Sequence, residues 1–155
     1  MFKSSSLLSS LRPFVIVPLA ASGLVLAGLS AAAAEEIEVV EHATTDAVTD
    51  TGAEGDSAGD ILTFANEVFD AEDKNKVGTN QGICFRTVVG KAWECFWTIS
   101  LDKGQITVEG PFYDAGDSVL AITGGTGEYA EAEGEMALSA IGTDGKAYRF
   151  IYKLK

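Results

Sequence analysis

After Asp60, glycines and other turn-forming residues divide the chain into short segments that are rich in β-branched and aromatic residues. Short segments of this composition between turn signals are typical of β-strands. A similar β-favouring run lies upstream of the acidic segment, within Glu36–His42, and predicts a first strand. The eight expected strands are Glu36–His42, Ile61–Phe69, Cys84–Val89, Trp93–Leu101, Ile106–Glu109, Ser118–Thr123, Met136–Ile141 and Lys146–Leu154.

Two short turns should join neighbouring strands as hairpins. Asp144-Gly145 is the strongest hairpin signal in the chain, and the glycine of Gly90-Lys91 suits the first central position of a type II′ turn. Eight antiparallel strands can close into a barrel that holds one small ligand, and closure removes exposed strand edges. The expected fold is therefore all-β, an eight-stranded antiparallel up-and-down barrel of lipocalin-like size.

One of the eight segments is ambiguous. The apolar residues of Ile61–Phe69 fit the spacing of a helix at least as well as the alternation of a strand. Periodicity alone leaves this segment undecided.

The first 34 residues have the pattern of a secretory signal peptide. They carry Lys3 and Arg12 and no acid, then an apolar run, Phe14–Leu29, and small residues up to Ala34. We expect cleavage near Ala34 and a secreted or periplasmic protein. The alternative is a retained membrane anchor, because the uncharged run Phe14–Ala34 is just long enough to span a bilayer.

The remaining residues are strongly acidic. They contain all 23 Asp and Glu of the chain, whose formal net charge is −12. Such a surface repels phosphates, so we expect neither nucleic acid nor anionic membranes as partners. The chain has one His, which leaves little scope for a metal site. Residues 35–60 read as a first strand plus an acidic loop, and residues 61–155 as the rest of a single barrel domain.

Cys84 and Cys95 are the only thiols and lie on neighbouring predicted strands. With a two-residue turn at Gly90-Lys91 they would lie diagonally, about 7–8 Å apart at Cα, the outer limit for a disulfide. A two-residue shift in register would place them directly opposite. An oxidising compartment favours the disulfide, whereas an inert buried thiol at Cys84 is the alternative.

Aromatic residues are concentrated on a few strands. Trp93, Cys95, Trp97 and Ile99 alternate onto one face of their strand, and later strands add further rings. Such a set can pack a core or line a ligand pocket, and the pattern leaves both interpretations open.

The stretch GQITVEGPF, residues 104–112, and the stretch DSVLAITGGTG, residues 117–127, resemble the plant allene oxide cyclases. Those enzymes carry a strand ending in Gly-Pro-aromatic and then Asp-Ser-x-Leu-Ala-Ile-Thr-Gly-Gly-x-Gly. Upstream, the motifs GD, FAN, VG and GIC between residues 59 and 84 follow the family in order and spacing. The dirigent proteins share the barrel and resemble this chain mainly through the Gly-Gly-Thr-Gly turn.

The resemblance implies an eight-stranded barrel, usually a homotrimer, with an apolar cavity and no cofactor. It also implies that Ile61–Phe69 is a strand. In the plant enzymes the cavity folds an unstable fatty-acid allene oxide so that it closes into one cyclopentenone enantiomer.

The family's site residues can be transferred only where the motifs match. Glu41 is the best match to the carboxylate that influences charge in the substrate, and Asn66 to the Asn that holds the epoxide oxygen. Ala43 stands where the family has a second polar Asn. The implied cavity residues are Phe64, Cys84, Trp93 in place of a Phe, and Phe112 in place of a Tyr.

Three functions are consistent with these features. The first is a cofactor-independent isomerase that directs stereoselective cyclisation of an oxidised lipid or a similar reactive apolar substrate. The second is a non-catalytic binder of a small hydrophobic molecule, and the third is a dirigent-like guide of radical coupling.

Overall fold

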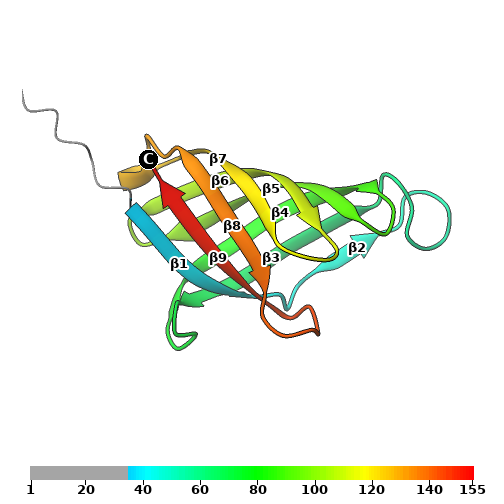
Figure 1. The fold of residues 1–155 in the computed structure, drawn as a ribbon, viewed down its shortest axis with the longest axis horizontal. Coiled ribbons are helices and arrows are strands. Elements are labelled where there is room, and N and C mark those ends of the chain that lie inside the picture. The colour runs from blue at the N-terminus through cyan, green and yellow to red at the C-terminus, as the bar shows by residue number, and fades with distance from the viewer. Residues whose placement is uncertain (1–34) are drawn as a thin grey trace, which may run out of the picture. The chain divides into compact units, whose positions relative to one another are not determined.

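The computed structural model describes residues 35–155, so the predicted signal peptide lies outside the described residues. Within them, the chain forms nine strands and one short 3₁₀ helix, η1, at Gly127–Tyr129. Figure 1 shows their arrangement. The strands are β1 (Glu35–His42), β2 (Ala47–Thr49), β3 (Ile61–Asp70), β4 (Lys76–Val88), β5 (Ala92–Leu101), β6 (Gly104–Tyr113), β7 (Ser118–Gly125), β8 (Gly134–Ala140) and β9 (Ala147–Leu154).

From β3 to β9, each strand pairs antiparallel with the next strand along the chain. β1 then pairs with both β9 and β3, which closes the sheet into a barrel of eight strands. The short strand β2 adds to β3 through Ala47–Thr49. The predicted eight-stranded antiparallel barrel is confirmed, and Ile61–Phe69 is a strand. The acidic segment 46–60 was expected to be loop throughout, so β2 corrects that prediction.

Strand β4 begins at Lys76, whereas the sequence predicted a strand only from Cys84. Its first half is polar and glycine-rich, which weakens the β signal. Gly82 is required by packing: a Cβ at this position would lie 2.3 Å from Cβ of Trp97. The glycine therefore makes room inside the barrel for the indole of Trp97.

The turn between β4 and β5 differs from the expected two-residue turn. Lys91 N–H donates to the carbonyl of Val88 at 3.0 Å, and the pairing register shifts between Arg86 and Val88. The turn, which pairs Val88 with Ala92, and the irregularity each shift the register by one residue, and together they place Cys84 directly opposite Cys95. The Cα atoms of the two cysteines are 4.0 Å apart, and the two form a disulfide. The predicted register was wrong by two residues, and the shifted register is the one that allows the disulfide.

The hairpin predicted at Asp144-Gly145 is present between β8 and β9. Ile141 N–H donates to the carbonyl of Ala147 at 2.8 Å, so the connecting loop spans residues 141–146. This loop lies at the same end of the barrel as the end of β1, which pairs His42 with Ala147.

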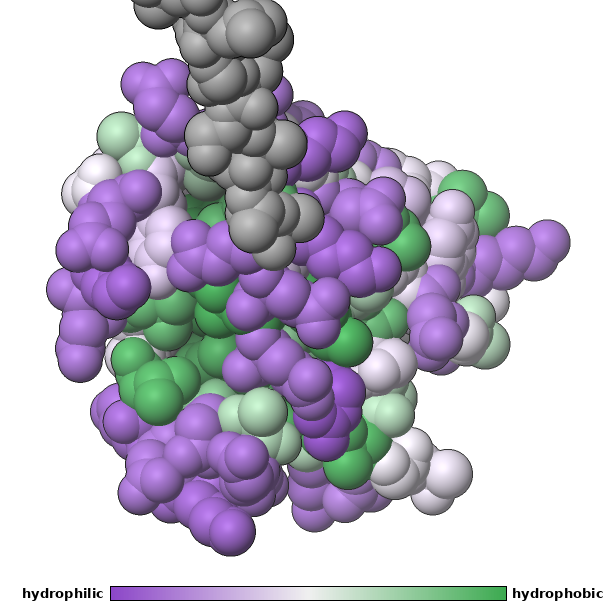
Figure 2. All heavy atoms as spheres, turned by 60° about the vertical axis from the view of Figure 1, so that its left-hand side comes forward, coloured by the Kyte–Doolittle hydropathy of each residue, from purple (hydrophilic) through white to green (hydrophobic). Residues whose placement is uncertain are grey.

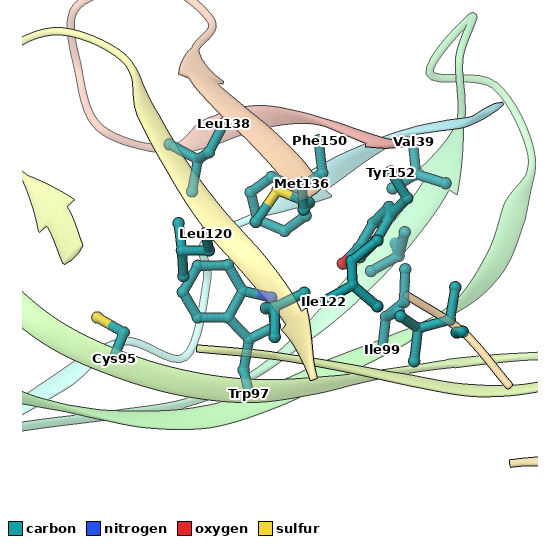
Figure 3. Packing of buried hydrophobic residues seen from close by; sticks show 14 of the residues in the cluster. Val39, Cys95, Trp97, Ile99, Leu120, Ile122, Met136, Leu138, Phe150 and Tyr152 are labelled. Carbon is teal, nitrogen blue, oxygen red and sulfur yellow. The ribbon is translucent and has the colours of Figure 1, made fainter. Parts of the chain in front are cut away.

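Apolar side chains fill the barrel interior (Figure 3). The face predicted from Trp93, Cys95, Trp97 and Ile99 is buried along its whole length. At the end where β1 begins and β9 ends, hydrophobic side chains are seen between hydrophilic ones (Figure 2). A groove of about 290 Å³ at that end is lined by Ile37, Glu38, Val39, Asp70, Val77, Leu101, Asp102, Lys103 and Tyr129.

Candidate functional site

A small cavity opens at the other end of the barrel, where β1 ends and β9 begins. Its volume is about 50 Å³, the space of a few water molecules. The wall is largely aromatic and includes two carboxylates. The lining residues are Glu41, Asp46, Leu62, Phe64, Cys84, Trp97, Phe112, Leu138, Tyr148 and Phe150.

Glu41 is the most buried carboxylate of this wall, with 5% of its surface exposed. The side-chain N–H of Asn80 donates to Glu41 Oε2 at 2.5 Å. Burial raises the pKa of Glu41 from 4.5 to about 7, with a further increase from Asp46, against the lowering effect of hydrogen bonds from Asn80 and Asn66. Near neutral pH the carboxyl is therefore present in both forms and can donate or accept a proton.

Asn66, predicted to hold a substrate oxygen, is buried and fully engaged by the chain itself. Its side-chain oxygen accepts hydrogen bonds from the backbone N–H groups of Thr44 at 3.1 Å and Thr45 at 3.0 Å, and from Thr45 Oγ1 at 2.9 Å. Its side-chain nitrogen donates to Asp46 Oδ1 at 2.9 Å. In this structure Asn66 fixes residues 44–46 and so positions Asp46 in the cavity wall.

The aromatic wall is built from rings on four strands. Phe64 and Trp97 meet edge to face with centroids 5.9 Å apart, and Trp97 stacks on Phe150 at 5.7 Å. Phe112 and Tyr148 form a second edge-to-face pair at 5.9 Å. These contacts make Trp97 part of both the packed core and the cavity wall. The aromatic pattern was consistent with a packed core or a ligand pocket, and Trp97 contributes to both.

Three of the four cavity residues implied by the resemblance line the cavity, namely Phe64, Cys84 and Phe112. The sulfur of Cys84 is bonded to Cys95, so the cavity wall holds no free thiol within the described residues. Trp93 is placed elsewhere. It is buried against the guanidinium of Arg86, which lies 4.0 Å from the ring centroid.

Three fully buried polar atoms near Glu41 have no hydrogen-bond partner among the described residues. They are Asn80 Oδ1, Trp97 Nε1 and the hydroxyl of Tyr152. The indole nitrogen of Trp97 and the hydroxyl of Tyr152 point toward one another (Figure 3). Burial raises the pKa of the Tyr152 hydroxyl, the indole N–H of Trp97 beside it opposes this effect, and the charge of Glu41 adds to it. Of these three side chains, only that of Trp97 lines the cavity.

Asn80 was missed by sequence reasoning, although a signal existed. Side chains alternate across a strand, so Asn80, Gly82 and Cys84 share one face of β4. Since the resemblance placed Cys84 in the cavity, extending the strand backwards by four residues would have pointed Asn80 inward.

A second hollow of about 210 Å³ adjoins the cavity at the same end of the barrel. Phe112, Leu138 and Tyr148 line both spaces and so form the wall between them. We call this hollow the mouth groove. Its other lining residues are Tyr113, Asp114, Gly116, Ala140, Gly142, Thr143 and Gly145.

The part of the chain that the structure describes offers no cluster of three or more metal-binding side chains. In the same residues no helix is both long and apolar enough to cross a membrane.

Comparisons with known proteins agree with this fold. The sequence profile of the allene oxide cyclase family matches residues 33–154. A solved structure of a pyocyanin demethylase is 31% identical, with a TM-score of 0.66 over 75% of this chain and 98% of that one.

Two more distant structures share the fold. A pterocarpan synthase dirigent protein is 14% identical with a TM-score of 0.64, over 79% of this chain and 97% of that one. An exo-specific intermolecular Diels-Alderase is 16% identical with a TM-score of 0.57, over 77% of this chain and 99% of that one. Given the profile match over nearly the whole barrel, the chain belongs to the allene oxide cyclase family.

Proposed function

We propose that this barrel is a cofactor-independent isomerase that takes a reactive, apolar small molecule into the cavity and directs its cyclisation. One observation carries the proposal: the carboxyl of Glu41 lies in an aromatic wall, held by Asn80, at a pKa of about 7. A buried acid that can change its protonation state at neutral pH is the kind of group that acid–base chemistry requires.

The cavity residues have different roles in the proposed reaction. Aromatic rings confine a flexible substrate and exclude water, which favours closure over hydrolysis. The ionised form of Glu41 stabilises positive charge that develops on the substrate carbon chain. The indole of Trp97 lines the cavity, and its N–H is a donor suited to an oxygen that gains negative charge.

The cavity volume favours a second candidate, a binder of small hydrophobic molecules without catalysis. About 50 Å³ is well below the several hundred Å³ of typical ligand pockets. A fatty-acid-sized substrate therefore needs Phe112 or Tyr148 to rotate out of the wall between the cavity and the mouth groove, so that the two spaces join. A smaller ligand requires less movement. The similarity to a protein named as a pyocyanin demethylase supports conversion of a small molecule, and the similarity to a dirigent protein keeps guided coupling as a third candidate.

We also propose that the protein acts outside the cytoplasm. The disulfide between Cys84 and Cys95 is typical of proteins that fold in an oxidising compartment, in agreement with the signal-like first 34 residues. A homotrimer, implied by the family resemblance, is proposed as the assembly.

Chiral analysis of the cyclopentenone tests the proposed isomerase. An allene oxide is generated from the methyl ester of a fatty-acid hydroperoxide, so that the substrate has no free carboxylate, beside the purified residues 35–155, and the product enantiomers are separated. We expect one enantiomer in excess, and Glu41→Gln should reduce this enantioselective turnover at least tenfold, since removal of an acid–base group typically costs a factor of about 100 or more. A product as racemic as the protein-free control would exclude the cyclase and leave ligand binding.

A further inference from the structure

The residues around the cavity mouth carry acids and no base. Glu41 and Asp46 line the cavity, and Asp114 lines the mouth groove. Neither lining set includes a Lys or Arg. Because Asp114 is paired with Arg86, the negative charge of the lining comes from Glu41 and Asp46.

Tyr148 shows how closely these acids gather, because its ring stands between the cavity and the mouth groove. Burial raises the pKa of the Tyr148 hydroxyl, and the charges of Asp46, Glu41 and Asp144 raise it further. Three carboxylates thus act on the Tyr148 hydroxyl. Asp46 lies in the segment between β1 and β2, and Asp144 lies in the loop between β8 and β9.

The bases near this end of the barrel do not offset the charges of Glu41, Asp46 and Asp144. The guanidinium of Arg86 is bound by Asp114 at 2.8 Å and lies 2.6 Å from Asp56, so it neutralises Asp114 and pairs with none of the other three acids. Lys91 and Lys146 lie on loops at this end, are exposed, and line neither the cavity nor the mouth groove. Asp46 and Asp144 take part in no salt bridge within the described residues.

The aromatic wall adds to the same preference. The faces of aromatic rings are electronegative and attract cations, most strongly where water is excluded. Five rings line this cavity together with the two carboxylates, on Phe64, Trp97, Phe112, Tyr148 and Phe150. Aromatic faces combined with carboxylates form a recognition site for organic cations, whereas a ligand carboxylate has no cationic partner in either lining set.

We propose that the cavity selects a planar, unsaturated organic cation over a neutral molecule of the same shape and against a carboxylate. The proposal rests on the proposed function, since it names the charge of the molecule that the cavity takes. It separates this chain from a binder of free fatty acids, whose carboxylate would lie among Glu41, Asp46 and Asp144.

Isothermal titration calorimetry with three bicyclic probes of matched shape tests the proposal. The probes are N-methylquinolinium as the cation, quinoline as the neutral molecule and 1-naphthoate as the anion, at about pH 8 and low salt. We expect the cation to bind at least tenfold more tightly than the anion, with quinoline between them. The preference should weaken as salt is added, because screening reduces charge interactions.

Two variants separate the local charges from the overall charge of the protein. Asp46→Asn keeps an oxygen that can accept from Asn66, and we expect it to weaken N-methylquinolinium binding about fivefold. Glu131→Gln removes the same charge from an exposed position beside η1, at the opposite end of the barrel, and should leave the affinity unchanged. Asp144→Asn is a second local variant, in case Asp46→Asn disturbs the fold.

The outcomes distinguish the inference from the proposed function. Binding of 1-naphthoate as tight as that of N-methylquinolinium, or equal effects of Asp46→Asn and Glu131→Gln, would overturn the charge preference. If no probe binds while the cyclopentenone is enantiomerically enriched, the charge preference is wrong and the isomerase stands. If no probe binds and the product is racemic, both are wrong.

Discussion

Glu41→Gln should raise the free energy of unfolding, and this increase should be about 3 kcal/mol larger at about pH 8 than at about pH 4.5. Burial holds the pKa of Glu41 at about 7 in the folded protein, above its ordinary value of 4.5. The folded state therefore binds the proton more tightly than the unfolded state. Raising the pH through this window ionises the buried carboxyl of Glu41, which costs folding free energy. The Gln variant does not ionise and so avoids this cost, and its side-chain oxygen can still accept the hydrogen bond from Asn80.

Urea unfolding of the wild type and the variant across this pH window measures the effect. Glu131→Gln is the matched control, because it removes one negative charge from an exposed position and should change stability little at any pH. A gap between wild type and Glu41→Gln that stays constant from about pH 4.5 to about pH 8 would contradict the account, since it would mean that Glu41 ionises as easily in the barrel as in the unfolded chain.

Reduction of the disulfide between Cys84 and Cys95 should destabilise the barrel by about 3 kcal/mol, the value expected for a crosslink across a sequence separation of 11 residues. Both residues are almost completely buried, and they join β4 to β5 in the wall behind the cavity. The bond removes freedom from the unfolded chain, because the two strands already pair in the folded state. The same loss is expected for the double variant Cys84→Ala/Cys95→Ala.

Urea unfolding with and without a thiol reductant measures this loss, and mass spectrometry after alkylation counts the free thiols. The double variant is the control for the reductant, since its unfolding midpoint should not respond to it. Two alkylated thiols in the unreduced wild type would contradict the disulfide. An unchanged midpoint in a wild type shown to be reduced would contradict its contribution to stability.

The architecture could be predicted because its signals are local and repeated. Seven of the eight barrel strands were predicted from β-branched and aromatic segments between turn residues, and the hairpin at Asp144-Gly145 is present. The ambiguous segment Ile61–Phe69 was assigned only through the family resemblance, because its apolar residues fit two periods. The short strand β2 was missed, since three exposed residues between acids carry no pattern that distinguishes a strand from a loop.

The details of register and site geometry depend on features that a strand pattern does not contain. The pairing differs by two residues from the expected register, one from the position of the turn and one from the irregularity between Arg86 and Val88, and this brings the cysteines opposite one another. Asn80 was not predicted as a site residue, because the glycine-rich half of β4 lacks a β signal. Its side chain nevertheless donates the hydrogen bond to Glu41.

Two residues that the family resemblance placed in the site have other partners. The amide of Asn66 holds residues 44–46, and Trp93 packs against Arg86. Which inward side chain reaches the cavity is decided by such tertiary contacts, and the sequence contains no local signal for them.

The most direct test of the central claim is a ¹³C NMR titration of the Glu41 side-chain carboxyl in protein labelled at glutamate Cδ. Subtracting the spectrum of Glu41→Gln identifies its resonance among those of the other glutamates. A buried carboxyl in the cavity wall predicts a titration midpoint near 7 that moves when a ligand occupies the cavity. A midpoint near the ordinary value of 4.5, unchanged by ligand, would contradict the claim that Glu41 is the acid–base group of this barrel.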